Sequence, residues 1–346
     1  MYKKNTHLSK IIKTIIVLFL ICVLLMGVLV SAYLMDKKLT FEKQEKYIPG
    51  IVCIGDSLTE GTDGSYPSYL EYILRENNIR VPVYNLGVGG ENTVTIAGRM
   101  GAIPFILDAF EIPAGVERTA VTFVQSPGKS IEPLLRSSDG GINPCQVCGV
   151  EGELSYDSNE NVYYFTRSEA GDAISVPENS EVVTYASYSY TNNIYILFMG
   201  ENVSYENAEE LLEQQKAIIA TQTGDDRYLI IGITSGTKEE REHLETLMYE
   251  YWGDRYINLR EILSDKDILE SHGIVLTEKD LEDMEQGIVP QAVRSDHVHY
   301  TAAGYAIVAE VVYEKMLELG YLTEVMEEAN SYASRWGWIQ KIKDLL

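Results

Sequence analysis

A serine, an aspartate and a histidine lie in two short segments near opposite ends of the chain. Ser57 lies in Gly55-Asp56-Ser57-Leu58, and Asp296 and His299 lie in Ser295-Asp296-His297-Val298-His299. A serine hydroxyl becomes a strong nucleophile when a base takes its proton, and a histidine base needs a carboxylate to orient it. An aspartate three residues before a histidine in a turn can accept from Nδ1 and leave Nε2 to face the serine. Together the segments predict acyl transfer, although each alone also fits an ordinary polar loop.

Two more segments offer N–H donors that could stabilise an oxyanion. Gly90 ends the glycine-rich segment 85–90, and Asn202 lies in Gly200-Glu201-Asn202. Acyl transfer places negative charge on the carbonyl oxygen, and preorganised N–H groups stabilise that charge. The glycine cluster also fits a plain strand-to-helix turn. It does not fit a dinucleotide-binding loop, because Asn92 stands where G-x-G-x-x-G needs its third glycine.

These four segments resemble, in order, the four sequence blocks of the SGNH (GDSL-type) hydrolase superfamily. The resemblance implies that Ser57 is the nucleophile, that Asp296 and His299 complete a triad, and that Ser57, Gly90 and Asn202 form the oxyanion hole. It also implies a flavodoxin-like α/β/α sandwich and an esterase that requires no metal and no organic cofactor. Val203 departs from the family pattern, which usually has aspartate after the asparagine.

The elements that must position these residues alternate along the chain. Ile51 to Ile54 is an apolar run that ends in Gly55, which predicts a buried strand. Further strands are expected at 81–84, 194–198, 228–233 and 256–257, and helices at 67–77, 206–221, 237–252 and from Thr301 to Gly320. Strands that alternate with helices predict a parallel sheet with both faces covered, and ligands bind such sheets at the carboxyl ends of the strands. The resemblance covers about residues 49–100 and 191–320, the predicted catalytic domain.

Residues 101–190 interrupt this alternation. Strands are expected at 120–124, 162–166, 173–176 and 182–190, with turn-forming residues between them and no visible helical period. We interpret this segment as a β-rich insertion that a crossover helix near 92–100 joins to the sheet. Because Gly90 and Asn202 must reach one oxyanion, the insertion is expected beside the Ser57 site, where it would select a bulky substrate, most readily a glycan.

The N-terminus predicts a membrane anchor. Residues 15–35 contain no charge over 21 positions, enough to cross a hydrocarbon core of about 30 Å as a helix. We therefore expect a cytoplasmic tail and transmembrane helix in 1–35, a linker in 36–48, and an extracytoplasmic catalytic domain. A signal peptide cleaved near Val30-Ser31-Ala32, which would give a secreted protein, is the alternative. Residues 321–346 are expected to form a helical tail.

Composition narrows the possible partners. The formal net charge is −24, which argues against nucleic acid because phosphate binding needs a surplus of basic residues. Cys145 and Cys148 form a lone C-x-x-C that cannot complete a four-ligand zinc site. The spacing of Cys145 and Cys148 is compatible both with a short-loop disulfide and with two free thiols. The sequence does not specify an oligomeric state.

The sequence favours hydrolysis of a carboxylic ester outside the cytoplasm, and the resemblance and location suggest an O-acetyl group on a glycan as substrate. An O-acyltransferase would use the same triad and oxyanion hole, so the motifs do not separate the two activities. A non-catalytic, surface-anchored glycan-binding protein is the alternative from another class, and the intact Ser57, Asp296 and His299 weigh against it.

Overall fold

The computed structural model describes residues 49–326 except 63, 125–128, 130, 133 and 222–225. Every helix and strand of the described residues belongs to the compact unit that begins at Pro49. The predicted anchor in 15–35, the linker in 36–48 and the tail beyond residue 326 lie outside the described residues. Within the described ranges, no helix is both long and apolar enough to cross a membrane.

A parallel sheet of five strands carries the predicted site. Its spatial order is β14-β13-β12-β1-β2, and all of its strand pairs are parallel. In chain order the strands are arranged 2-1-3-4-5, the flavodoxin-like order. The parallel sheet and its five strands were predicted from the sequence; their bounds are β1 Ile51–Gly55, β2 Val83–Gly87, β12 Ile194–Phe198, β13 Tyr228–Ile231 and β14 Tyr256–Ile257.

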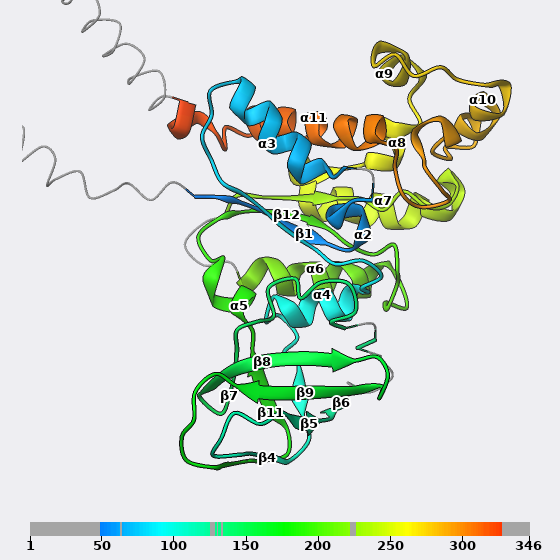
Figure 1. Ribbon diagram of the computed structural model, residues 1–346. Coiled ribbons are helices and arrows are strands. Elements are labelled where there is room, and N and C mark those ends of the chain that lie inside the picture. Colours follow the sequence, from blue (N-terminus) through cyan, green and yellow to red (C-terminus); the bar gives the residue numbers. More distant parts are fainter. Residues whose placement is uncertain are drawn as a thin grey trace, which may run out of the picture. The chain divides into compact units, whose positions relative to one another are not determined.

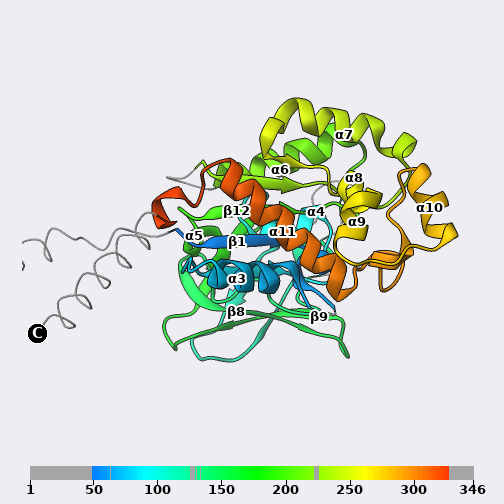
Figure 2. The same cartoon turned by 90° about the horizontal axis from the view of Figure 1, so that it is seen from above.

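Helices cover both faces of this sheet (Figures 1 and 2). Alternate residues of β1 pack against the two helical layers, because successive side chains of a strand point to opposite faces of the sheet. Ile51 and Cys53 pack with α3 (Tyr66–Glu76) and α11 (Ala302–Glu318), whereas Val52 and Ile54 pack with α4 (Thr93–Arg99), α6 (Ala208–Thr221) and α7 (Lys238–Trp252). Both clusters are apolar, which accounts for strands that are hydrophobic on both faces.

The predicted helices form where their capping residues indicate. Thr237 and Glu240 make the capping box that starts α7, and Thr301 caps α11 through the Gly304 N–H. The sequence did not predict several short helices, one directly after β1 and the others between α7 and α11. They are α2 Ser57–Glu60, η1 Gly253–Arg255, α8 Leu259–Leu263, α9 Lys266–Ser271, α10 Glu278–Glu285 and η2 Gln291–Val293.

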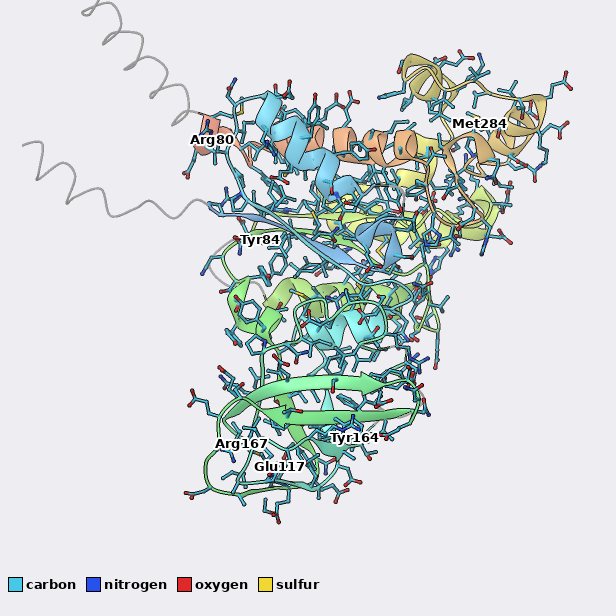
Figure 3. All side chains as sticks on the ribbon, in the orientation of Figure 1. Arg80, Tyr84, Glu117, Tyr164, Arg167 and Met284 are labelled. Carbon is cyan, nitrogen blue, oxygen red and sulfur yellow. The ribbon has the colours of Figure 1, made fainter. Side chains whose placement is uncertain are left out.

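The segment between α4 and β12 contains antiparallel strands that surround a third apolar core. A seven-stranded sheet has the order β5-β9-β8-β7-β11-β3-β6, and β10 pairs with β4. Arg167 of β9, labelled in Figure 3, joins the two sheets by donating to the carbonyls of Pro113 and Asp172 at 2.8 and 2.9 Å. The bounds are β3 Ile106–Leu107, β4 Phe110–Ile112, β5 Thr119–Val121, β6 Phe123–Val124, β7 Cys145–Val147, β8 Val150–Asp157, β9 Val162–Arg167, β10 Ile174–Val176 and β11 Ser180–Val183.

Two predicted strands in this segment differ from the structure. The strand expected at 120–124 is two strands, because β5 pairs with β9 and β6 pairs with β3. Residues 182–190 were expected to be a single strand, but β11 ends at Val183 and α5 spans Tyr185–Ser189. Thr184 ends the strand by capping α5, since its hydroxyl accepts from the Ser187 N–H. The high β-propensity of the tyrosines is overridden here by burial of Ala186 against the parallel-sheet domain.

The insertion packs against α4, the predicted crossover helix. A Cβ on Gly98 would lie 2.3 Å from the Phe105 ring, and the Thr184 hydroxyl donates to the Arg99 carbonyl at 2.6 Å. The antiparallel strands therefore lie on the side of α4 away from the parallel sheet (Figure 1), not over the carboxyl ends of its strands. Cys145 is buried in β7 and Cys148 is exposed, and both are free thiols.

Candidate active site

Ser57 lies where β1 turns sharply into α2. The Asp56 carboxylate caps α2 by accepting from the Leu58 N–H at 3.0 Å, which places Ser57 in the first helical turn. Two glycines let α2 approach the strand ends. A Cβ on Gly55 would lie 2.3 Å from the Thr59 Oγ1 of α2, and one on Gly87 would lie 2.0 Å from the Glu60 nitrogen. The Gly-Asp-Ser turn is therefore required by packing at the carboxyl edge of the sheet.

His299 joins Ser57 to Asp296, although Ser57 and His299 are 242 residues apart. The His299 Nε2 lies 2.8 Å from the Ser57 Oγ, and its Nδ1 lies 2.7 Å from an Asp296 carboxylate oxygen. With the proton on Nδ1, the carboxylate accepts from the ring and Nε2 is left to accept from the serine hydroxyl. This is the arrangement of a nucleophile, a base and an orienting acid.

Asp296 is held in place by its own turn. Its other carboxylate oxygen accepts from the N–H groups of Val298 and His299, each at 2.7 Å. The hydrogen bond from His299 and these two backbone bonds hold the pKa of Asp296 well below its ordinary value. Asp296 therefore stays ionised across the physiological range. His297 is exposed, and its carbonyl accepts from Arg294 at 2.9 Å.

The two predicted oxyanion donors meet beside this triad. Gly90 adopts a φ of 79°, a conformation that favours glycine, in the turn after β2. Asn202 follows β12, and its side-chain amide donates to the carbonyl of Glu91 at 2.9 Å. The Gly90 turn is hydrogen-bonded to the end of β1, because the Val88 N–H donates to the Gly55 carbonyl at 3.2 Å. The structure thus brings all five predicted site residues to the carboxyl edge of adjacent strands.

Asp56, which precedes Ser57 in the chain, is buried. It is 1% exposed, and burial raises the pKa of its carboxyl group to about 7. One of its oxygens caps α2, and the other has no hydrogen-bond partner among the described residues. The sequence assigned no role to this side chain, whose burial could not be read from a turn motif.

The Glu201 carboxylate, between Gly200 and Asn202, links the loops of the site. No role was expected for this residue from the sequence. Glu201 accepts from the Thr234 N–H at 2.5 Å, and the Thr234 hydroxyl hydrogen-bonds the Tyr300 hydroxyl at 2.7 Å. Arg294 donates to the Thr234 carbonyl at 3.0 Å. The loop that carries Asn202 is thereby connected to the loop that carries Asp296 and His299. An acid beside the oxyanion asparagine is the signal that could have indicated this.

No protein-family model matches this sequence, and no curated protein matches it. Among solved structures, the chain is similar to a protein from Desulfitobacterium hafniense DCB-2 that is described as a lipolytic protein of the G-D-S-L family. The two are 12% identical with a TM-score of 0.37, and the match covers 78% of this chain and 98% of that chain. A likeness this distant says nothing of what the chain does, so the chemistry of the site rests on its geometry.

Proposed function

We propose that this chain is a serine ester hydrolase of the SGNH (GDSL-type) superfamily. The observation that carries the proposal is the continuous hydrogen-bonded series from Ser57 Oγ through His299 to the Asp296 carboxylate. An ordinary solvated loop does not place a histidine between a serine and a carboxylate that lie at opposite ends of the catalytic domain in the sequence.

The reaction follows from this geometry in two halves. The Ser57 oxygen attacks the ester carbonyl while His299 Nε2 takes the hydroxyl proton, and Asp296 stabilises the imidazolium that forms. The negative charge of the tetrahedral intermediate is stabilised by hydrogen bonds from the N–H groups of Ser57 and Gly90 and from the Asn202 amide. The alcohol then leaves with the proton from His299. Water, activated by the same histidine, attacks the acyl-serine and releases the acid.

The proposed substrate is an O-acetyl group on an extracytoplasmic glycan. The support is the charge-free segment 15–35, which would hold the catalytic unit outside the cytoplasm as a single-pass membrane protein, and the family resemblance. N-terminal sequencing of the native protein tests the location. A mature N-terminus at Tyr33 in a soluble fraction would instead indicate a secreted enzyme.

The test of function is an activity screen of residues 36–346 on acetyl esters, with and without a glycan acceptor. Hydrolysis of p-nitrophenyl acetate and release of acetate from an acetylated glycan are expected. Acetylated acceptor as the main product would identify the O-acyltransferase alternative. A protein that binds glycan but turns over no ester would contradict the proposal and support a binding role.

A further inference from the structure

Arg99, the last residue of α4, is completely buried and donates four hydrogen bonds to separate parts of the chain. Its exposed fraction is 0%. One terminal nitrogen donates to the carbonyls of Gly55 and Leu86 at 3.1 and 3.0 Å, and the other donates to the Gly140 carbonyl at 2.6 Å. Its Nε donates to a Glu91 carboxylate oxygen at 2.6 Å. A buried guanidinium this fully bonded fixes the relative positions of its four acceptors.

The acceptors surround the nucleophile turn and the oxyanion turn. Gly55 and Leu86 lie at the carboxyl ends of β1 and β2, and Gly55 stands two residues before Ser57. Gly140 belongs to the insertion. Arg99 therefore joins the strand ends that carry Ser57 and the Gly90 turn to a residue that the parallel-sheet domain does not supply.

Glu91 carries this connection to both oxyanion donors. It follows Gly90 in the chain, and its own carbonyl accepts from the Asn202 amide at 2.9 Å. Its side chain is 1% exposed, and one carboxylate oxygen has no partner among the described residues. Burial raises the pKa of Glu91, while Arg99 opposes that rise.

Stability alone does not account for this pair. Desolvation makes a buried ion pair costly, and apolar residues of similar volume often stabilise a protein as well or better. What apolar residues cannot do is hold four backbone and side-chain oxygens in one geometry. Three of those oxygens, from Gly55, Leu86 and Glu91, lie at or next to the nucleophile and oxyanion turns, and this location points to catalysis.

We infer that Arg99 and Glu91 are positioning residues that set the spacing of the oxyanion donors. The insertion completes this hydrogen-bonded arrangement through the Gly140 carbonyl. The inference rests on the proposed esterase function and deepens it. Neither side chain touches the substrate. The insertion is then a structural part of the active site as well as a neighbour of it.

The Gly140 contact can be tested from the insertion side. Gly140 has a φ of 55°, and an added Cβ would lie 2.7 Å from the Arg99 Nη1 and 2.3 Å from a Val88 methyl. Gly149 has a φ of 78°, but an added Cβ would have nothing within 4 Å. Gly140→Ala and Gly149→Ala therefore share the backbone strain, and only the first disturbs Arg99.

The ion pair can be tested with a second matched pair of variants. Glu91→Gln removes the charge and keeps the shape. Glu245→Gln does the same at Arg260, a buried arginine that bonds Glu245 and the Gly287 carbonyl away from the site. All four variants would be assayed on p-nitrophenyl acetate, together with the affinity for an alkylboronic acid, whose serine adduct mimics the tetrahedral intermediate.

We expect Gly140→Ala and Glu91→Gln to lower kcat about tenfold, part of what loss of a whole oxyanion donor causes, with KM within about twofold. Boronic acid affinity should fall in parallel. Both controls should keep wild-type kcat and boronate affinity, whatever their melting temperatures. If wild type is active and the two test variants match their controls in kcat and boronate affinity, the inference is wrong. If one test variant does not fold, the other decides. A wild-type protein that turns over no ester removes the proposed function and this inference with it.

Discussion

Ser57, Asp296 and His299 could be found from the sequence because each lies in a short contiguous motif. Gly55 to Leu58 fixes a turn, and Asp296 bonds His299 within one turn of its own. The structure brings these residues together, and their catalytic role stays a prediction. Arg99 could not be found in this way, because its acceptors Gly55 and Gly140 lie 44 and 41 residues away. No local pattern encodes contacts of that kind.

Among the proposed oxyanion donors, Asn202 is the one whose contribution is most directly measurable. Asn202→Ala is expected to lower kcat by about 10²–10³, the usual loss for one donor. The reason is that its amide would no longer reach either the Glu91 carbonyl, which it now bonds at 2.9 Å, or the oxyanion. Steady-state kinetics on p-nitrophenyl acetate measure this. A mutant within a few-fold of wild type would show that Asn202 is not a donor.

Asp56 predicts how stability depends on pH. Its pKa is raised from 3.8 to about 7, so between these values the folded protein binds more protons than the unfolded chain. The contribution of Asp56 to stability therefore falls as pH rises through that window. Asp56→Asn cannot ionise, yet it can still accept from the Leu58 N–H.

Melting temperatures of wild type and Asp56→Asn between pH 4 and pH 7 test this. The wild type should lose stability relative to the mutant as pH rises, because burial penalises the ionised carboxylate of Asp56. Comparing the two proteins removes the effect of other titrating groups. Parallel curves would mean that Asp56 titrates in the folded protein as it does in the unfolded chain.

At the scale of elements, the strands that are buried on both faces were the most accessible from the sequence. The strands β1, β12 and β13 are continuous apolar runs, so their existence and order were accessible. The longest insertion strand, β8 at Val150–Asp157, was missed, because one of its two buried residues, Gly152, is a glycine and only Leu154 is a large apolar side chain that is fully buried. The strand predicted at 182–190 was wrong for the opposite reason, because strand-favouring residues form the helix α5 there.

The loop between β12 and α6 holds a strained residue beside Asn202. Val203 has a φ of 63° and is 50% exposed, and its carbonyl accepts from the Thr93 N–H at 3.1 Å. A β-branched residue in this conformation costs on the order of 1–3 kcal/mol. Because glycine adopts it freely, Val203→Gly is expected to raise the melting temperature by a few degrees.

A suitable control is Val275→Gly, at a residue that is 86% exposed and lacks a positive φ. That change should leave the melting temperature unchanged or lower it, because glycine adds only unfolded-state entropy there. Differential scanning calorimetry compares the two. Equal destabilisation by both substitutions would rule out strain at Val203.

At the scale of the whole molecule, the insertion relates to the site differently from the sequence-based expectation. Its strands pack against α4, and the residues that reach the Gly90 turn and its surroundings are Glu132, Ser137 and Gly140. Asn92 donates to the Glu132 carbonyl at 3.1 Å, and the Ser137 hydroxyl donates to the Gly89 carbonyl at 3.5 Å. Selection of a bulky substrate by the insertion stays a prediction, and these residues are the part that could make it.

Replacing residues 104–190 with a short Gly/Ser linker tests this relation. From the sequence alone, such a change should spare small acetyl esters. From the contacts, we expect lower turnover of p-nitrophenyl acetate and a lower melting temperature, because Arg99 loses the Gly140 carbonyl and α4 loses its cover. A linker variant with wild-type kcat and melting temperature would show that the insertion is an independent module.

The central claim is that Ser57 is a nucleophile activated by His299, whose Nε2 lies 2.8 Å from its hydroxyl oxygen. The most direct measurement is labelling of the intact protein with a fluorophosphonate, followed by mass spectrometry of the digested adduct. We predict one adduct, on the peptide that contains Ser57, which disappears in Ser57→Ala and in His299→Ala while both variants stay folded. Failure of the wild type to label, or labelling that persists in Ser57→Ala, would contradict the claim.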